Sequence, residues 1–195
     1  MSHYFENDNN LKSEIEEFNV SIRNKTFSFN TDNGVFSKKE LDFGTKLLIE
    51  NVLNENIQGN ILDLGCGYGP IGIVLKKILN VHVTMVDINK RAVHLTKMNA
   101  KKNDVLVNVY ESDGFNNVND SFDFVISNPP VRVGKKKMYE LILDAKKHLK
   151  QDGKLYIVLR KEQGALSFIK DMSVYYCVNV IDKQKGFFII SLKSN

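Results

Sequence analysis

The sequence lacks the hallmarks of several large protein classes. Its only two cysteines in 195 residues, Cys66 and Cys177, are isolated, so we expect neither a disulfide framework nor a cysteine-based metal site. The four histidines form no ligand-spaced pair, which predicts that no metal is bound. The longest apolar runs, such as IGIVL and LYIVL, are too short to span a bilayer. The polar, acidic N-terminus does not look like a signal peptide, so we expect a cytoplasmic protein.

What is present favours one globular domain. Hydrophobic residues make up 43% of the chain and charged residues 26%, as in ordinary soluble domains. A chain of this length can bury a full hydrophobic core. We therefore predict a single domain over residues 1–195, with an N-terminal extension at 1–35 and a core at 36–195.

Positive charge is concentrated in the second part of the chain. Residues up to Val131 include 13 Lys and Arg against 17 Asp and Glu, whereas those from Arg132 onward include 14 against 6. Such a basic region favours an anionic partner, nucleic acid first. A lysine-rich solvated surface explains the same counts, so charge alone leaves both interpretations open.

The apolar pattern alternates between strand and helix periods, which predicts an α/β fold. Core strands are expected at 60–65, 81–87, 105–113, 122–128 and 154–160. Helices are expected at 70–79, 89–103, 136–149 and 161–172. Short hairpins are expected at the two ends, at 16–36 and 174–193, with a helix at 37–55 after the first. The prediction is a Rossmann-like, doubly wound, mostly parallel sheet of seven strands with an antiparallel C-terminal hairpin strand, plus the N-terminal hairpin and helix.

A glycine-rich loop, DLGCGYGPIG, follows the first core strand. Gly65, Gly67 and Gly69 let the backbone approach a ligand closely, and the helix opened by Pro70 presents its N-terminus to a negative group. Asp87 ends the next strand, where a carboxylate can accept hydrogen bonds from ribose hydroxyls. These features fit NAD and S-adenosylmethionine equally, and Asp87 could instead cap the following helix.

Asp63 separates the two cofactors, because a dinucleotide fold usually has an apolar residue inside this strand. A carboxylate there can hold the cationic amino-acid end of S-adenosylmethionine. The pattern D-x-G-x-G-x-G followed by an acidic strand end resembles the cofactor site of class I S-adenosylmethionine-dependent methyltransferases. The resemblance implies that Asp113 accepts from the adenine amino group, although Asp-Gly also occurs as a plain turn. It implies the following cofactor-binding residues: Phe36, Thr45, Asp63, Gly65, Cys66, Gly67, Gly69, Pro70, Asp87, Ile88, Asp113, Gly114 and Asn128.

The stretch ISNPPVRVGKKK follows the fourth core strand, at the same predicted sheet edge. Asn128, Pro129 and Pro130 resemble the Asn-Pro-Pro motif of amino-group methyltransferases and are the predicted catalytic residues. The carbonyls of Asn128 and Pro129 can accept the N–H groups of a target amine, which orients its lone pair toward the methyl donor. The prolines stiffen the loop, so that these acceptors are already in place.

The residues after the prolines indicate which branch of this class the chain belongs to. Val131 stands where other branches carry an aromatic residue, and NPPVRVGKKK resembles the small-domain (MTS) family, especially its RsmC-like group of small-subunit ribosomal RNA guanine-N2 methyltransferases. The resemblance implies that Val131, Arg132 and Lys135 contact the substrate, and that the partner is ribosomal RNA or the small subunit.

Other activities stay open at this point. The acceptor could be a protein glutamine, adenine N6 or a small-molecule amine. An NAD(P)-dependent oxidoreductase built on GYGPIG leaves the Asn-Pro-Pro motif unexplained. A non-catalytic RNA-binding relative has no need for Asp63, Asp87 and Asn128 together.

Overall fold

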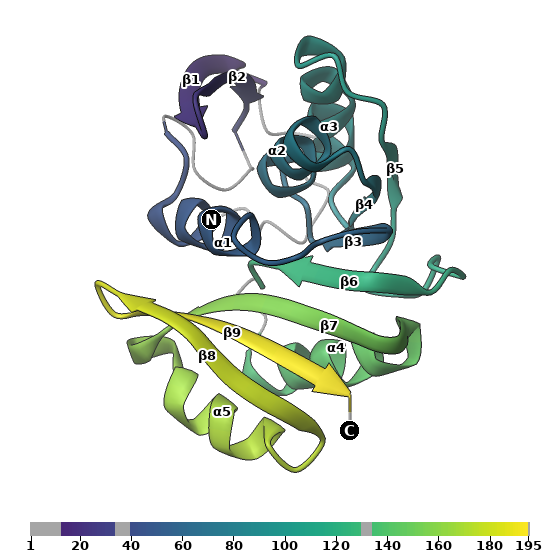
Figure 1. Cartoon of the computed structure of the whole chain (residues 1–195). Helices are drawn as coiled ribbons and strands as arrows, with labels where there is room; N and C mark the ends of the chain where they lie inside the picture. Colours follow the sequence, from purple (N-terminus) through teal and green to yellow (C-terminus); the bar gives the residue numbers. More distant parts are fainter. Residues whose placement is uncertain (1–12, 34–39, 130–133, 195) are drawn as a thin grey trace.

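The computed structural model describes residues 13–33, 40–129 and 134–194, and it shows one large sheet covered by helices on both faces (Figure 1). The sheet has seven strands in the order β5-β4-β3-β6-β7-β9-β8. Its strands are β3 (Asn60–Leu64), β4 (His82–Asp87), β5 (Asn108–Glu111), β6 (Phe122–Ser127), β7 (Leu149–Arg160), β8 (Tyr176–Gln184) and β9 (Phe187–Ser194). Strands β3 to β7 are parallel, and β9 runs antiparallel to both β7 and β8, which confirms the predicted fold class.

The sheet separates the hydrophobic core into two layers, one under the helices of each face. Its central strands are apolar on both sides. In β3, for example, every residue after Asn60 is buried, as expected for a parallel strand covered on both faces. One apolar cluster lies under α1 (Phe43–Val52), α2 (Pro70–Leu79) and α3 (Lys90–Lys102). The other lies under α4 (Lys135–His148) and α5 (Ala165–Met172).

The strand order reverses between β3 and β6. From β3 the chain moves outward through β4 to β5, and it then returns to β6 on the other side of β3. In open α/β sheets, ligands bind beyond the carboxyl ends of the strands at such a reversal. The end of β3, the glycine loop after it and the end of β6 therefore surround the expected site.

The structure corrects four predicted boundaries. Strand β7 begins at Leu149 rather than 154. Helix α1 begins at Phe43 rather than near residue 37, because the Asp42 side chain caps it, and residues 34–39 lie outside the described part. Strand β5 begins at Asn108 rather than 105, and Leu106 is 88% exposed. The helix predicted at 161–172 is a 3-10 turn, η2 (Lys161–Gln163), and then α5, because Gly164 adopts a positive φ of 87° between them.

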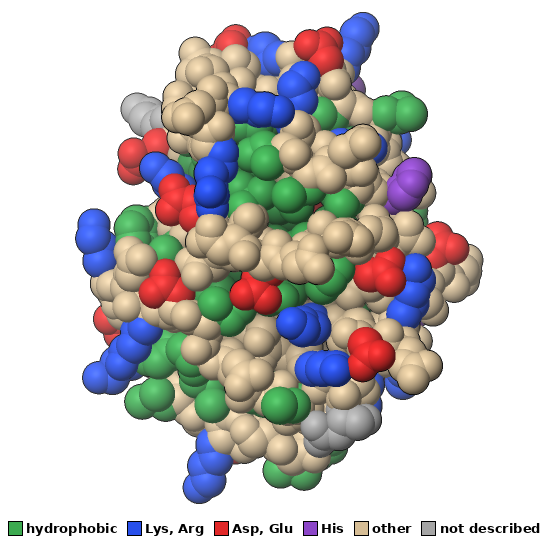
Figure 2. Space-filling view, in the orientation of Figure 1, with side chains coloured by type: hydrophobic (Ala, Val, Ile, Leu, Met, Phe, Trp, Pro, Cys, Tyr) green, Lys and Arg blue, Asp and Glu red, His purple; other side chains and the backbone are tan. Residues whose placement is uncertain are grey.

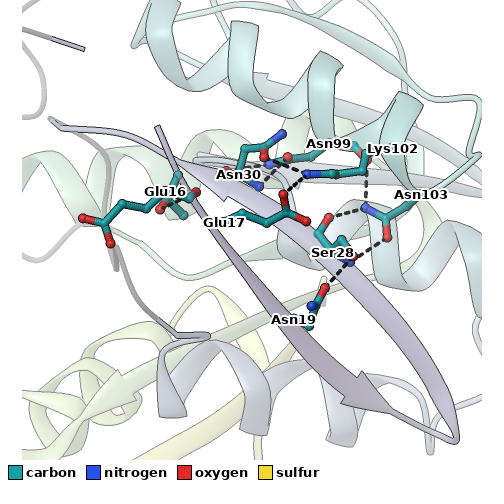
Figure 3. Close-up of polar contacts among 9 residues, drawn as sticks. Glu16, Glu17, Asn19, Ser28, Asn30, Asn99, Lys102 and Asn103 are labelled. Atoms are coloured by element: carbon teal, nitrogen blue, oxygen red, sulfur yellow. Dashed lines mark hydrogen bonds and ion pairs between the residues drawn. The ribbon is translucent and has the colours of Figure 1, made fainter. Parts of the chain in front are cut away.

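The N-terminal hairpin of β1 (Glu16–Ile22) and β2 (Lys25–Thr31) is a separate two-stranded sheet that packs on α3. Figure 3 shows Asn99 and Asn103 of α3 reaching the backbone of β2. The Asn99 amide accepts from Asn30 N at 2.8 Å and donates to Asn30 O at 2.9 Å. Asn103 makes the same pair of hydrogen bonds with Ser28. These two side chains replace a neighbouring strand for β2, so they explain why a polar residue at 99 lies on the apolar stripe of the helix.

Among the described residues, no helix is long and apolar enough to cross a membrane.

Replacing Asn99 by Ala is expected to lower the free energy of unfolding by about 2–4 kcal/mol, because buried backbone groups then lose their partners. Asn99 is fully buried, and its amide also donates to Tyr68 O in the glycine loop at 2.8 Å. Urea unfolding measures the change, with Lys97→Ala on the exposed side of α3 as the control. Equal unfolding midpoints for the two variants would contradict this role.

Candidate active site

The glycine loop is held against the end of β4 by backbone hydrogen bonds. The N–H groups of Gly65 and Cys66 both donate to Val86 O at 2.9 Å. The next N–H, that of Gly67, donates to the Asp87 carboxylate at 2.8 Å. The structure thus brings together the loop and the acidic strand end, which the sequence placed on separate strands.

Two of the loop glycines serve different purposes. Gly65 has a φ of 73°, and a Cβ built there meets no atom within 4 Å, so this side of the loop is open to a ligand. Gly69 has a φ of 94°, and a Cβ there would lie 2.9 Å from side-chain carbons of Ile73 and Thr96. Gly69 therefore permits tight packing of α2 against α3, whereas Gly65 leaves room for close approach to the backbone.

Asp87 does not cap the helix that follows it. The N-cap of α3 is Asn89, whose side chain accepts from Arg91 N and Ala92 N. Asp87 accepts from Asn89 N at 2.9 Å with one carboxylate oxygen and from Gly67 N with the other. The capping alternative is therefore wrong, and the predicted contact of Asp87 with ribose hydroxyls stays a prediction.

Asp63 is a fully buried carboxylate with half of its hydrogen-bonding capacity unused. Its Oδ2 accepts from Gly72 N at 2.9 Å, but among the described residues its Oδ1 is the one buried side-chain nitrogen or oxygen without a hydrogen-bond partner. Burial raises the pKa of Asp63 to about 7, the Gly72 hydrogen bond lowers it and the nearby Asp87 charge raises it further. An orphaned anionic oxygen beside an open glycine loop suits a cationic ligand group, so these residues fit the amino-acid end of S-adenosylmethionine.

The remaining predicted cofactor residues surround the same edge. Asp113 is exposed in the turn after β5, forms an ion pair with Lys137 of α4 at 3.3 Å, and is followed by the half-buried Gly114. Ile88 is half-buried just after β4. The Cys66 thiol is buried 3.6 Å from the Thr96 hydroxyl, and burial raises its pKa well above the usual range. Pro70 is buried at the first position of α2.

Asn128 lies just beyond β6 and is held by the start of α1. Its Nδ2 donates to the Thr45 hydroxyl at 2.9 Å and lies 3.4 Å from the Asp42 carboxylate. The Thr45 hydroxyl in turn donates to Asp42 at 3.1 Å, so its oxygen must accept from Asn128. This sequence of donors fixes which way the amide points. The Asn128 Oδ1 accepts no hydrogen bond from the described part of the chain and is available to a substrate amine.

Asp42 belongs to this support, although sequence analysis assigned it no role of its own. It caps α1 through Thr45 N at 2.8 Å and reaches Asn128 at the same time. The available signal was its position three residues before Thr45, which is typical of an N-cap and its bonded amide. That spacing predicts the cap but not the contact with a residue at the end of a distant strand.

The predicted acceptor-binding residues are only partly described. Pro129 is buried after Asn128, and Lys135 begins α4 with its ammonium 3.1 Å from Asp171. Lys135 also lines a cavity of about 130 Å³ between α4 and the turn after β7, together with Gly164 and other residues. Four predicted residues lie outside the described part: Phe36, Pro130, Val131 and Arg132.

Asp63 makes stability depend on pH in a defined direction. Its folded pKa of about 7 exceeds the ordinary value of 3.8, so between these values the folded protein keeps a proton that the unfolded chain has lost. The free energy of unfolding of the ligand-free protein is therefore expected to fall as pH rises from about 4 to about 7, and then to level off. Urea unfolding across this range should show the fall in the wild type and a smaller one in Asp63→Asn. Parallel curves for the two proteins would show that Asp63 titrates normally.

The chain is similar to known proteins in sequence and in fold. The sequence profile of the family "Methyltransferase small domain" matches residues 26–191. The uncharacterized protein YbxB of Bacillus subtilis is 42% identical over 198 residues, which cover 98% of both chains. Ribosomal RNA small subunit methyltransferase C of Haemophilus influenzae is 45% identical over 130 residues, which cover 64% of this chain but 39% of that protein. The chain thus spans well under half the length of this second relative.

A similar fold occurs in the 16S rRNA N2 methyltransferase RsmC of T. thermophilus, solved with AdoMet and guanosine. The TM-score is 0.83 at 21% identity, over 93% of this chain and 51% of that one. The family match confirms the enzyme class and cofactor expected from the sequence, a methyltransferase that uses S-adenosylmethionine. The chain belongs to the methyltransferase small domain family.

Proposed function

We propose that this protein methylates the exocyclic N2 amine of a guanine in small-subunit ribosomal RNA and acts in the cytoplasm. The observation that carries this proposal is the Asn128 amide, which Thr45 and Asp42 hold so that its carbonyl oxygen is left for an amine. The RNA acceptor is supported by the relatives named ribosomal RNA small subunit methyltransferase C and by the basic second half of the chain.

The residues of the site divide the work between cofactor and acceptor. S-adenosylmethionine, when bound, supplies a methyl group activated by a sulfonium centre. Asp63 would hold its ammonium, Asp87 its ribose and Asp113 its adenine, around the open side of Gly65. Asn128 Oδ1 and the Pro129 carbonyl would accept the two N–H groups of the target amine and orient its lone pair, so the two reactants meet in line. No strong base is required, because the amine can lose its proton after the transfer.

A base within folded RNA must leave its stack to reach Asn128. The Asn128 side chain is partly buried at the sheet edge, and the exocyclic amine of a guanine inside a duplex is engaged with its paired base. We therefore expect the enzyme to act on an unstacked guanine, in a loop or flipped out of a helix.

The proposal is tested by methyl transfer from tritiated S-adenosylmethionine. The substrates are unmodified small-subunit RNA made in vitro and small subunits from a strain without this protein, followed by nucleoside analysis. Label in N2-methylguanosine is the expected result. Label in another nucleoside, in a protein or in no macromolecule would reject the proposed acceptor and leave the methyltransferase class in place.

Asn128→Ala is expected to lower kcat by about 100-fold, as when one positioned hydrogen-bonding group is removed from an active site. Binding of S-adenosylmethionine, measured by titration calorimetry, should change little, because the proposed cofactor contacts come mainly from the loops after β3, β4 and β5. Turnover near the wild-type rate would reject Asn128 as the residue that positions the amine.

Thr45→Val should lower kcat by about tenfold, because the Asn128 amide loses the neutral hydrogen bond that sets its orientation. Thr45→Ser keeps the hydroxyl and should restore most of the rate. The KM for S-adenosylmethionine distinguishes this orienting role from the cofactor contact that the resemblance implies for Thr45. It should stay near its wild-type value in both variants if Thr45 acts through Asn128, and rise in the valine variant if Thr45 binds the cofactor. A serine variant as slow as the valine variant would contradict this role, because the hydroxyl alone would then not restore the rate.

A further inference from the structure

Two partly buried phenylalanine rings and two exposed cations form a cluster at the carboxyl edge of the sheet. The rings of Phe43 and Phe187 lie 5.4 Å apart between centroids, at an angle of 52°. The Arg160 guanidinium lies over the Phe187 ring at 4.7 Å, and the Lys185 ammonium lies over the Phe43 ring at 4.8 Å. These four residues are called the cation–ring cluster below.

The cluster adjoins the support of Asn128. Gly44 separates Phe43 from Thr45 in the first turn of α1, and the Phe187 ring lies against it. A Cβ at Gly44 would be 2.7 Å from the nearest ring carbon of Phe187 and 3.2 Å from the Asp42 carboxylate. Only Gly44 therefore lies between the Phe43 ring and Thr45, which supports the Asn128 amide. A side chain at Gly44 would displace the Phe187 ring.

The strand order places the two cations at the same edge of the sheet as Asn128, the edge formed by the carboxyl ends of the parallel strands. Arg160 ends β7, which pairs with β6 in parallel, so both strands end at one edge. Lys185 lies in the turn between β8 and β9, and this turn reaches the same edge because Phe187 pairs with Arg160. Figure 2 shows Lys and Arg side chains projecting from the left of the view, where Figure 1 draws the tip of the β8–β9 hairpin.

Positive charge exceeds negative charge on the two connections that carry these cations, after β7 and between β8 and β9. The basic residues there are Arg160, Lys161, Lys183 and Lys185, and the acidic residues are Glu162 and Asp182. The Arg160–Glu162 contact is long, at 3.8 Å, and Glu162 is 77% exposed, so a phosphate can displace it at little cost. The Asp182 carboxylate already accepts from the side-chain amides of Asn51 and Gln184.

The rings hold these two cations in fixed positions, unlike surface lysines that contact no ring. A cation over an aromatic face is attracted to the ring and loses part of its freedom before any ligand binds. Arg160 and Lys185 still keep their charged ends exposed, and the Arg160 side chain is 48% accessible. Two cations fixed at the rim of the site suit the phosphates of a strand, which position a nucleic acid without reading its sequence.

We propose that the cation–ring cluster binds the sugar-phosphate backbone of the RNA strand beside the target nucleotide. This inference rests on the proposed function and adds the surface by which the RNA is held while its base reaches Asn128. Neither Arg160 nor Lys185 belongs to the basic run Lys135–Lys137 that the sequence singled out.

The test compares two double variants with the same change in net charge. Arg160→Gln with Lys185→Gln removes both cations of the cluster. Lys101→Gln with Lys147→Gln removes two exposed cations near the C-terminal ends of α3 and α4, at the opposite edge of the sheet. Filter binding to unmodified small-subunit RNA, measured at several salt concentrations, gives the dissociation constant and its salt dependence.

The cluster variant should bind this RNA at least about tenfold more weakly than the control variant near physiological salt. The slope of log K against log salt should fall by roughly 1.5, as for two lost phosphate contacts. The KM for RNA should rise in parallel, and the affinity for S-adenosylmethionine should stay within about twofold. Phe187→Leu keeps the net charge but frees Arg160, and it should weaken RNA binding several-fold with little change in melting temperature.

The outcomes separate this inference from the proposed function. Equal RNA binding by the cluster and control variants would overturn the inference, and RNA methylation by the wild type would still uphold the function. Cluster-dependent RNA binding without transfer to guanine would reject the function and keep the surface. Failure of the wild type to bind RNA would overturn both.

Discussion

The arrangement of the site depends on the two hydrogen bonds that the Asp87 carboxylate accepts. This carboxylate binds the N–H groups of Gly67 and Asn89, so one side chain fixes the glycine loop after β3 and the start of α3 after β4. Helix α3 then carries Asn99, which binds the carbonyl of Tyr68 in the same loop and the backbone of the N-terminal hairpin. The glycine loop is therefore held by contacts at the start of α3 and by Asn99 near its end. The N-terminal hairpin is attached to the loop through the same helix.

Asp63 shows how a binding site conflicts with stability in this fold. A fully buried carboxylate with one unpartnered oxygen is costly, and burial raises its pKa to about 7 for that reason. An amide or an apolar residue would suit the empty protein better. In the proposed function this carboxylate meets a cationic group of the cofactor, which would explain why a local rule of stability is broken here.

The sequence predicted the parts of the site that follow from strand ends and missed those that follow from long-range packing. Glycines after an apolar strand and an acidic residue after the next strand are local signals, and parallel pairing brings them to one edge. The support of Asn128 by Asp42 and Thr45 joins α1 to the end of β6, and the contact of Phe43 with Phe187 joins α1 to the last strand. No spacing in the sequence encodes such contacts, because they depend on how the helix crosses the sheet.

The uneven charge of the chain acquires a physical meaning from the topology. The acidic first part supplies the three carboxylates at the ends of β3, β4 and β5, and S-adenosylmethionine is a cation at both its sulfur and its ammonium. The basic second part supplies the other half of the edge, beyond β6 and β7, where an anionic RNA would lie. Ser127 joins the halves, because its hydroxyl at the end of β6 donates to Leu64 O at the end of β3 at 2.7 Å. The reversal of strand order thus separates the acidic edge that we propose for the cofactor from the basic edge that we propose for RNA, and Asn128 lies at the boundary between them.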